Sequence, residues 1–302
     1  MPSIKRGINY LIHNRVQFCD SIVKNYLGWL PDKPYLSLRY RLQMGHWINW
    51  NKPKTFTEKI QWLKVYNRKP EYTTMVDKYA VKKYVADRIG EVYIIPTIGV
   101  WDRLEDIDLA SLPKKFVLKT THGGGSCGVV ICSDKEKIDL EKAASKLKDS
   151  LNADIYKDLR EWPYKNVPKR IIAESFLESP NGELNDYKFF CFNGKVKFFK
   201  VDFGRFIEHH ANYYSPDGKL LAFGERGLEP DANANIHLPD NISEMIVLAE
   251  KLSAEEFFLR VDFYNVNGHI YFGELTFYPA SGMIPWTPNE ADIEIGNYLN
   301  IK

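Results

Sequence analysis

The sequence of 302 residues predicts an α+β protein, with helices gathered in its N-terminal third and antiparallel hairpins in its C-terminal half. Two Asn-Gly pairs, at 193–194 and 267–268, each separate two apolar runs, which is a strong signal of a two-residue hairpin turn. Helical spacing of apolar residues runs instead through 4–30 and 139–152. The chain is therefore expected to combine antiparallel hairpins with amphipathic helices, as an α+β protein does.

The composition is that of a soluble globular protein of one or two lobes, with 44% hydrophobic and 26% charged residues. The four cysteines show neither a CxxC pair nor metal-ligand spacing, so we expect reduced thiols. No run of about 18 apolar residues occurs, and charged residues interrupt the apolar positions near the N-terminus. We expect a cytoplasmic protein, with contact to the inner face of the cell membrane left open.

Charge is distributed unevenly along the chain. Residues 1–70 contain 13 Lys and Arg against 3 Asp and Glu, a surplus of ten, which leaves the remainder at minus eight. Such a basic segment can face anionic lipid, nucleic acid or an acidic polymer, or it can be a solvated face. The helix at 4–30 can likewise lie on a membrane surface or pack on its own domain.

The N-terminal half continues as a series of helices. Helical patterns cover 35–50, then 55–66 after a turn at 51–54, with Thr55 or Thr57 as the cap. A further helix is predicted over Met75–Ile89, and Val92–Ile95 reads as a strand before Pro96. Residues 102–112 are expected to form a short helical connection.

The stretch Phe116–Val130, FVLKTTHGGGSCGVV, is the most informative local pattern. Apolar flanks predict two strands, and the glycines predict a loop whose backbone N–H groups can turn toward an anion. Lys119 stands just before this loop and could compensate phosphate charge. The pattern is neither a Walker A loop nor a dinucleotide fingerprint, because no helix opens after it. An ordinary mobile hairpin is the alternative interpretation.

The C-terminal half is rich in strands. A helix is predicted at 139–152, a buried strand at 171–173, and a polar loop at 178–185. The two Asn-Gly turns pair 187–192 with 195–202, and 257–264 with 269–275, and a helix is expected over 241–256.

The last predicted hairpin carries two carboxylates, Asp262 and Glu274, inside strongly apolar strands. Pairing of the strands would bring the two side chains together, and close like charges need a cation between them. Mg²⁺ is the usual cation where oxygen ligands and phosphates meet. The alternative is that both side chains simply point outward.

The order of these motifs resembles the ATP-grasp superfamily. The segments WINWNKPKTFTEK at 47–59 and GELTFYPASG at 273–282 are similar to one branch, the TupA-like group named for teichuronopeptide synthesis. The resemblance extends from Leu38 to Trp286. It implies an ATP-grasp fold, in which two α+β lobes grip ATP, here with an N-terminal helical extension. The implied division is an extension at 1–70, core at 71–112, a glycine-hairpin lid at 113–175 and a C-terminal lobe at 176–302.

The resemblance also assigns roles by position. Lys78 and Lys119 resemble the lysines that hold ATP phosphates, and Asp186 the acid that binds ribose. Asp262 and Glu274 resemble the metal ligands. Arg260 and Lys119 resemble the groups that act at the reacting phosphate. The implied loop over the phosphates consists of Gly123, Gly124, Gly125 and Ser126 and runs on to Gly128. The implied hinge that binds adenine consists of Glu174, Ser175, Phe176 and Leu177. Further implied phosphate or substrate contacts are Lys188, Lys200 and Arg205. The family commonly has Asn where this chain has Thr276, whose hydroxyl, or a water, would complete the metal site.

The resemblance implies an ATP- and Mg²⁺-dependent carboxylate–amine ligase that acts through an acylphosphate. The setting it suggests is the joining of an amino acid or other amine to a uronic-acid surface polysaccharide or its precursor, and no nucleic acid partner is expected. One alternative is an ATP-dependent sugar kinase. Others are a glycosyltransferase with a metal motif at Asp106-Ile107-Asp108, and a polysaccharide-binding protein that uses Trp47, Trp50 and Trp62.

Overall fold

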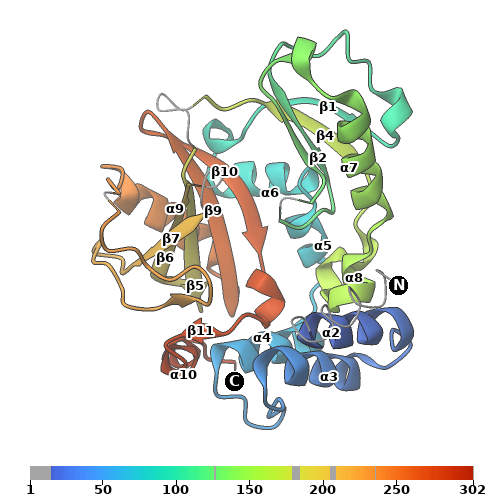
Figure 1. Cartoon of the computed structure of the whole chain (residues 1–302). Helices are drawn as coiled ribbons and strands as arrows, with labels where there is room; N and C mark the ends of the chain where they lie inside the picture. The colour runs from blue at the N-terminus through green and yellow to red at the C-terminus, as the bar shows by residue number, and fades with distance from the viewer. Residues whose placement is uncertain (1–14, 126, 179–183, 205–208, 235, 302) are drawn as a thin grey trace.

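The computed structural model describes residues 15–125, 127–178, 184–204, 209–234 and 236–301. In these residues it shows a larger antiparallel sheet of five strands and a smaller one of four, with helices between and below them (Figure 1), and a third sheet of only two strands. The helices are α2 (Arg15–Tyr26), α3 (Asp32–Met44), α4 (Phe56–Tyr66), α5 (Glu71–Val76), α6 (Ala80–Ile89), α7 (Leu140–Asn152), α8 (Ile155–Leu159), α9 (Ile242–Ser253) and α10 (Glu290–Tyr298). The strands are β1 (Thr97–Trp101), β2 (Phe116–Thr120), β3 (Val129–Cys132), β4 (Ile171–Ser175), β5 (Asp186–Phe192), β6 (Lys195–Phe203), β7 (His210–Tyr214), β8 (Gly224–Glu225), β9 (Phe258–Val266), β10 (His269–Thr276) and β11 (Trp286–Thr287).

The larger sheet has the order β10-β9-β5-β6-β7, and all its pairs are antiparallel. Both Asn-Gly pairs form the tight turns of its hairpins. Asn193 and Gly194 have φ of 47° and 77°, and Asn267 and Gly268 have φ of 52° and 82°. Two successive positive φ values are what a type I′ turn requires. The α+β prediction is confirmed, and its strongest local signals are the turns that fix the register of this sheet.

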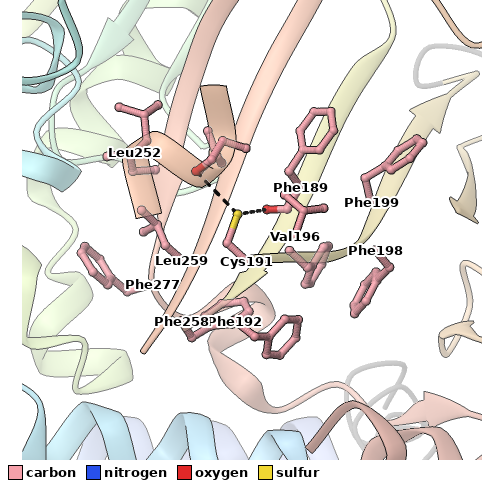
Figure 2. Close-up of a cluster of buried hydrophobic side chains, with 14 of the residues drawn as sticks. Phe189, Cys191, Phe192, Val196, Phe198, Phe199, Leu252, Phe258, Leu259 and Phe277 are labelled. Carbon is pink, nitrogen blue, oxygen red and sulfur yellow. Dashed lines mark hydrogen bonds between the residues drawn. The ribbon is translucent and has the colours of Figure 1, made fainter. Parts of the chain in front are cut away.

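One face of the larger sheet is an apolar core closed by α9, which packs on β5, β6 and β9. Figure 2 shows Phe189, Phe199 and Leu259 gathered there with Leu252 of α9 around the thiol of Cys191. The Cys191 Sγ lies 3.7 Å from the Phe189 carbonyl oxygen and 3.8 Å from that of Ala249. Burial raises the pKa of Cys191 to about 12, so this thiol is an unreactive part of the core.

The opposite face of the same sheet is divided into an aromatic end and a charged end. Phe190 stacks on Phe198 with ring centroids 4.5 Å apart, and Trp286 of β11 closes over both. Phe56, the first residue of α4, packs edge-on against Phe258 in the same layer at 5.1 Å. Side chains two residues apart share a face, so Lys188 begins the charged end beside Phe190. Helix α4 thus covers the aromatic end and leaves the charged end to the site.

The smaller sheet has the order β1-β4-β2-β3 and is covered by α7. The predicted strand at Val92–Ile95 is wrong, because Glu91–Tyr93 form a 3₁₀ turn and β1 begins only at Thr97. Pro96 has no N–H to donate to a ladder, so the strand starts after it. The helical connection predicted at 102–112 is reduced to a 3₁₀ turn, Leu104–Asp106.

The helix predicted over Met75–Ile89 is broken into α5 and α6. The Asp77 carboxylate accepts hydrogen bonds from the N–H groups of Tyr79, at 2.8 Å, and Ala80, at 3.1 Å, and so starts α6 afresh. Arg170, which precedes β4, holds the other carboxylate oxygen at 2.8 Å. The break fixes Lys78, whose N–H donates to the Thr121 carbonyl at 2.9 Å.

The N-terminal helices follow the predicted pattern with shifted bounds. Of the helix predicted at 4–30, α2 is seen and residues 4–14 lie outside the described residues. Thr55 caps α4 through a capping box with Glu58. The part of the chain that the structure describes has no helix long and apolar enough to cross a membrane.

Candidate functional site

The charged end of the larger sheet is a row of ionised side chains placed by strand register. Lys188 of β5 stands directly between Lys200 of β6 and Asp262 of β9. Its ammonium group contacts Asp186, lies 2.9 Å from Asp202 and 3.7 Å from Asp262, and the side chain is buried. Burial opposes the charged form, but these carboxylates outweigh it and raise the pKa of Lys188. This part of the sheet therefore holds fixed charge away from water.

Arg260 joins the two carboxylates that the sequence predicts as metal ligands. Its Nε donates to Asp262 Oδ1 at 2.7 Å, and its Nη2 donates to Asp262 Oδ2 at 2.6 Å and to Glu274 Oε1 at 2.8 Å. The same Nη2 lies 3.0 Å from Thr276 Oγ1. Oxygens from Asp262, Glu274 and Thr276 thus converge on one cationic nitrogen.

A β-bulge brings Glu274 to this position. The register of β9 and β10 shifts between Phe272 and Glu274, so that Glu274 comes to lie opposite Asp262. Gly273 occupies the bulge, and a Cβ there would lie 3.1 Å from the Asp262 carbonyl oxygen. Bulges commonly re-aim a side chain next to a site, and here the bulge turns the two predicted ligands toward each other.

Cations control the charge of Glu274. Burial would raise the pKa of its carboxyl, but Lys78, at 3.7 Å, and Arg260 outweigh burial and lower the pKa to about 2. Burial raises the pKa of Asp262, with Arg260 and Lys188 acting against it. The two neighbouring carboxyl groups therefore differ in how readily they take a proton.

The lowered pKa predicts a pH-dependent contribution of Glu274 to stability. Its folded pKa lies below the ordinary value of 4.5, so the stabilisation is complete above pH 4.5 and is lost as the pH falls to about 2. We expect roughly 1–2 kcal/mol, because the side chain is 30% exposed and solvent screens part of the interaction. Urea unfolding of wild type and Glu274→Gln at pH 7, 4.5 and 3 measures it. A stability difference that stays constant over this range would contradict the prediction.

Lys78 connects this cluster to the glycine hairpin. Its ammonium group donates to the Gly123 carbonyl oxygen and faces Glu274. The base of the hairpin is tightly packed, since a Cβ on Gly128, where φ is +71°, would lie 2.3 Å from Ser150 Oγ. Gly125 is exposed, with φ of +59° and open space around it. Glycine is therefore required at the base for packing, while the tip is unobstructed.

Glu174, on the strand next to β2, holds two lysines. Its carboxylate lies 2.5 Å from the ammonium group of Lys119 and 2.7 Å from that of Lys82. Burial alone would raise the pKa of Glu174, but the two lysines lower it, so the carboxylate is ionised. Lys82 was not among the residues predicted from the sequence. The available signal was its spacing of four residues from Lys78 within the helix predicted over Met75–Ile89.

The other residues predicted to bind the nucleotide or substrate lie in β4, β5, β6 and the hairpin, or outside the described residues. Ser175 ends β4, and its N–H donates to the Pro96 carbonyl oxygen at 3.0 Å, while Phe176 and Leu177 follow half-buried. Asp186, at the start of β5, is buried against Lys188, and Lys200 lies 2.8 Å from Glu225. Gly124 is half-buried in the hairpin. Ser126 and Arg205 lie outside the described residues.

The donor set around Arg260 has the chemistry that suits Mg²⁺. The described residues contain no cluster of three or more His, Cys, Asp and Glu side chains able to hold a metal ion. Mg²⁺, however, is typically held by one or two carboxylates together with water and substrate phosphates. Two carboxylates and a hydroxyl that already surround one cationic nitrogen meet that requirement.

The motif of the glycosyltransferase alternative is an ordinary surface turn. Asp106 pairs with Arg103 at 2.8 Å, and Asp108 accepts a hydrogen bond from the Ala110 N–H at 3.0 Å. Both acids are exposed. They satisfy local contacts beside the smaller sheet, and the charged end of the larger sheet uses neither.

Comparison with known proteins gives one family. The sequence profile of the family described as TupA-like ATPgrasp matches residues 58–300. No curated relative matches the chain.

Similar solved structures include a D-alanine–D-alanine ligase from Helicobacter pylori, at 16% identity and a TM-score of 0.44, covering 81% of this chain and 69% of that one. An L-amino acid ligase from Bacillus licheniformis has 14% identity and a TM-score of 0.42, covering 75% and 49%. An N5-carboxyaminoimidazole synthetase from Staphylococcus aureus, complexed with ADP, has 16% identity and a TM-score of 0.40, covering 72% and 50%. The chain spans about half the length of the latter two proteins.

Proposed function

Since the chain belongs to the TupA-like ATP-grasp family, we propose that it is an ADP-forming ligase that joins an amine to a uronic-acid carboxyl group. The saccharide would be a surface polysaccharide or its precursor. One observation carries the proposal. Arg260, two carboxylates and Lys78 form a single charged cluster, and Lys78 ties that cluster to the glycine hairpin. Such an arrangement can hold a nucleotide's phosphates between a sheet and a closing loop.

In this proposal, each part of the nucleotide is bound by a separate group of residues. Lys119 and Lys78 hold the phosphates under residues 123–128, and Glu174 with Leu177 binds adenine. Asp186 binds the ribose. Residues 1–70 form the extension, 71–112 the first part of the core, 113–175 the lid and 176–302 the lobe with the metal site. When bound, Mg²⁺ would be held by Asp262, Glu274 and Thr276 and would neutralise phosphate charge.

The reaction needs an activated carboxyl group, because an amine does not attack a carboxylate readily. A carboxylate oxygen of the saccharide forms a bond to the γ-phosphorus of ATP, and the bond from that phosphorus to the bridging oxygen breaks, releasing ADP. The amine then attacks the acyl carbon, phosphate leaves, and the nitrogen loses a proton. Arg260 and Lys119 stabilise the phosphoryl group as it moves, and the hairpin excludes water that would hydrolyse the acylphosphate.

An acidic saccharide matches the charge of the chain. Residues 1–70 carry a surplus of ten positive charges, and uronic acids are anionic at neutral pH. We expect the enzyme to work in the cytoplasm, at the inner face of the cell membrane, where a lipid-linked acceptor would be presented.

The test is a product analysis with ATP, Mg²⁺, a uronic-acid oligosaccharide and a panel of amino acids. We expect ADP and free phosphate in equal amounts, only when both carboxylate and amine are present. Hydroxylamine should trap the activated carboxyl group as a hydroxamate. The matched control is the same oligosaccharide with its carboxyl groups reduced to alcohols, which should give no product. Formation of ADP without free phosphate, and without need of an amine, would instead identify a sugar kinase.

A further inference from the structure

Helix α2 exposes a stripe of apolar and aromatic side chains. Phe18, Ile22 and Tyr26 follow one another at four-residue spacing on the helix, and Trp29 follows in the turn after the helix ends. Their exposed fractions are 36%, 39%, 73% and 76%, respectively. A helix that packs on its own domain normally turns such a stripe inward. In α2 the stripe faces solvent instead.

An ion pair fixes this orientation. Asp20, on the opposite side of α2, accepts hydrogen bonds from Arg39 of α3 at 2.6 and 3.0 Å. Arg39 is buried and also donates to the Asp158 carbonyl oxygen at 2.6 Å, which ties α2 and α3 to α8. A buried charge separated from its partner costs several kcal/mol. Because rotating α2 to bury the stripe would separate Asp20 from Arg39, the outward stripe is a built feature.

The segment of the chain that carries the stripe is strongly basic in sequence. Residues 15–54 contain seven Lys and Arg and two acids, Asp20 and Asp32, and both acids are paired with arginines. Residues 1–14 add Lys5 and Arg6 and no acid, so residues 1–54 carry a surplus of seven. The rest of the chain carries minus five. The positive charge of the chain is thus concentrated in residues 1–54, the basic segment that also carries the exposed aromatics.

We propose that this stripe, Phe18, Ile22, Tyr26 and Trp29, is a membrane-docking face for anionic lipid. Tryptophan and tyrosine favour the level of the lipid headgroups, and flanking lysines and arginines are attracted to anionic headgroups. A symmetric dimer through the same face would bring two copies of the basic segment together, which like-charge repulsion opposes. Charge therefore favours a membrane over a second copy. This proposal concerns where the protein acts and does not depend on the proposed reaction.

Helix α8 connects the docking face to the glycine hairpin through direct contacts. Tyr35 and Arg39, behind α2, both donate to the Asp158 carbonyl oxygen in α8. At the other end of α8, Ile155 lies against the hairpin, 3.5 Å from where a Cβ on Gly124 would stand. A membrane under α2 would therefore be one short helix away from the loop over the site.

Binding of the full chain to vesicles tests the proposal. We expect it to sediment with phosphatidylcholine vesicles that contain 30% phosphatidylglycerol, to bind phosphatidylcholine alone much less, and to be released by salt. The variant Phe18→Ser, Ile22→Ser, Trp29→Ser should bind the anionic vesicles at least ~10-fold more weakly, because it removes the inserted apolar area. The matched control, Val92→Ser, Ile131→Ser, Val247→Ser, changes three exposed apolar residues outside the basic segment at 1–54 and should bind normally.

Trp29→Ser alone, at a largely exposed position, serves if the triple variant fails to fold. Failure of the wild type to bind anionic vesicles, or an equal loss in stripe and control variants, overturns the proposal. It is also overturned if the stripe variant converts a dimer into a monomer while vesicle binding is unchanged, because a second copy would then be the occupant.

Discussion

Replacing Glu274 with glutamine is expected to lower ATP turnover by at least ~100-fold, the scale of losing one preorganised electrostatic contact. Glutamine keeps the shape of the side chain but removes the charge that faces Lys78 and Arg260. In the proposed reaction the metal would then be held poorly, and the phosphoryl group would move without its full set of partners. Turnover and melting temperature are to be measured on the same preparation.

The fold of this variant should survive with a slightly lower melting temperature. Two clustered carboxylates repel each other, so removing one of them would by itself leave stability unchanged or improved. In this structure, however, Glu274 lies between two cations and its net interactions are favourable. Glu250→Gln is the matched control, since Glu250 pairs with Lys195 at 2.7 Å on the far side of the sheet. A destabilised Glu274→Gln protein with full activity per folded molecule would refute the metal-site assignment.

Replacing Lys119 with alanine should weaken ATP binding by roughly 10- to 100-fold, the range of a hydrogen bond to a charged group. The folded state should tolerate the change. Lys119 is half-buried in β2, and without it Glu174 still has Lys82 as its partner at 2.7 Å. Calorimetric titration with ATP and Mg²⁺ gives the affinity, and melting with and without nucleotide gives the stabilisation that binding produces.

Lys115→Ala is the control for this measurement. Lys115 precedes the same strand but pairs with Glu178 at the surface. It should leave both affinity and stability close to wild type, since exposed ion pairs contribute little. An ATP affinity unchanged by Lys119→Ala would mean that the glycine hairpin is only a connecting loop.

The elements that the sequence predicted well are those set by neighbouring residues. The Asn-Gly turns determine the two hairpins of the larger sheet, and the capping box at Thr55 starts α4. The break between α5 and α6 was missed because the apolar pattern runs on across it. Its cause is partly the contact of Asp77 with Arg170, 93 residues further along the chain. No local pattern contains that contact.

The same distinction applies to the site. Hairpin pairing made the proximity of Asp262 and Glu274 predictable, and the register confirms that they lie opposite each other. The bulge at Gly273 and the position of the Arg260 guanidinium group between the carboxylates depend on side-chain packing and could not be inferred. Lys82 was missed because its partner, Glu174, belongs to a strand that follows 92 residues later.

The anchored base of the glycine hairpin limits how the site can shut. Thr121 is held on both sides, by the Lys78 N–H and by the Arg170 backbone, at 2.9 Å each, and Thr120 is held by Ser150 at 2.6 Å. Among the described residues of the loop, Gly124, Gly125 and Cys127 lack such hydrogen-bond anchors. If the hairpin closes over the phosphates as proposed, the anchored base confines the movement to these few residues. The conformational entropy lost would then be that of a short segment, so most of the ligand's binding free energy would remain available for holding the reacting groups in line.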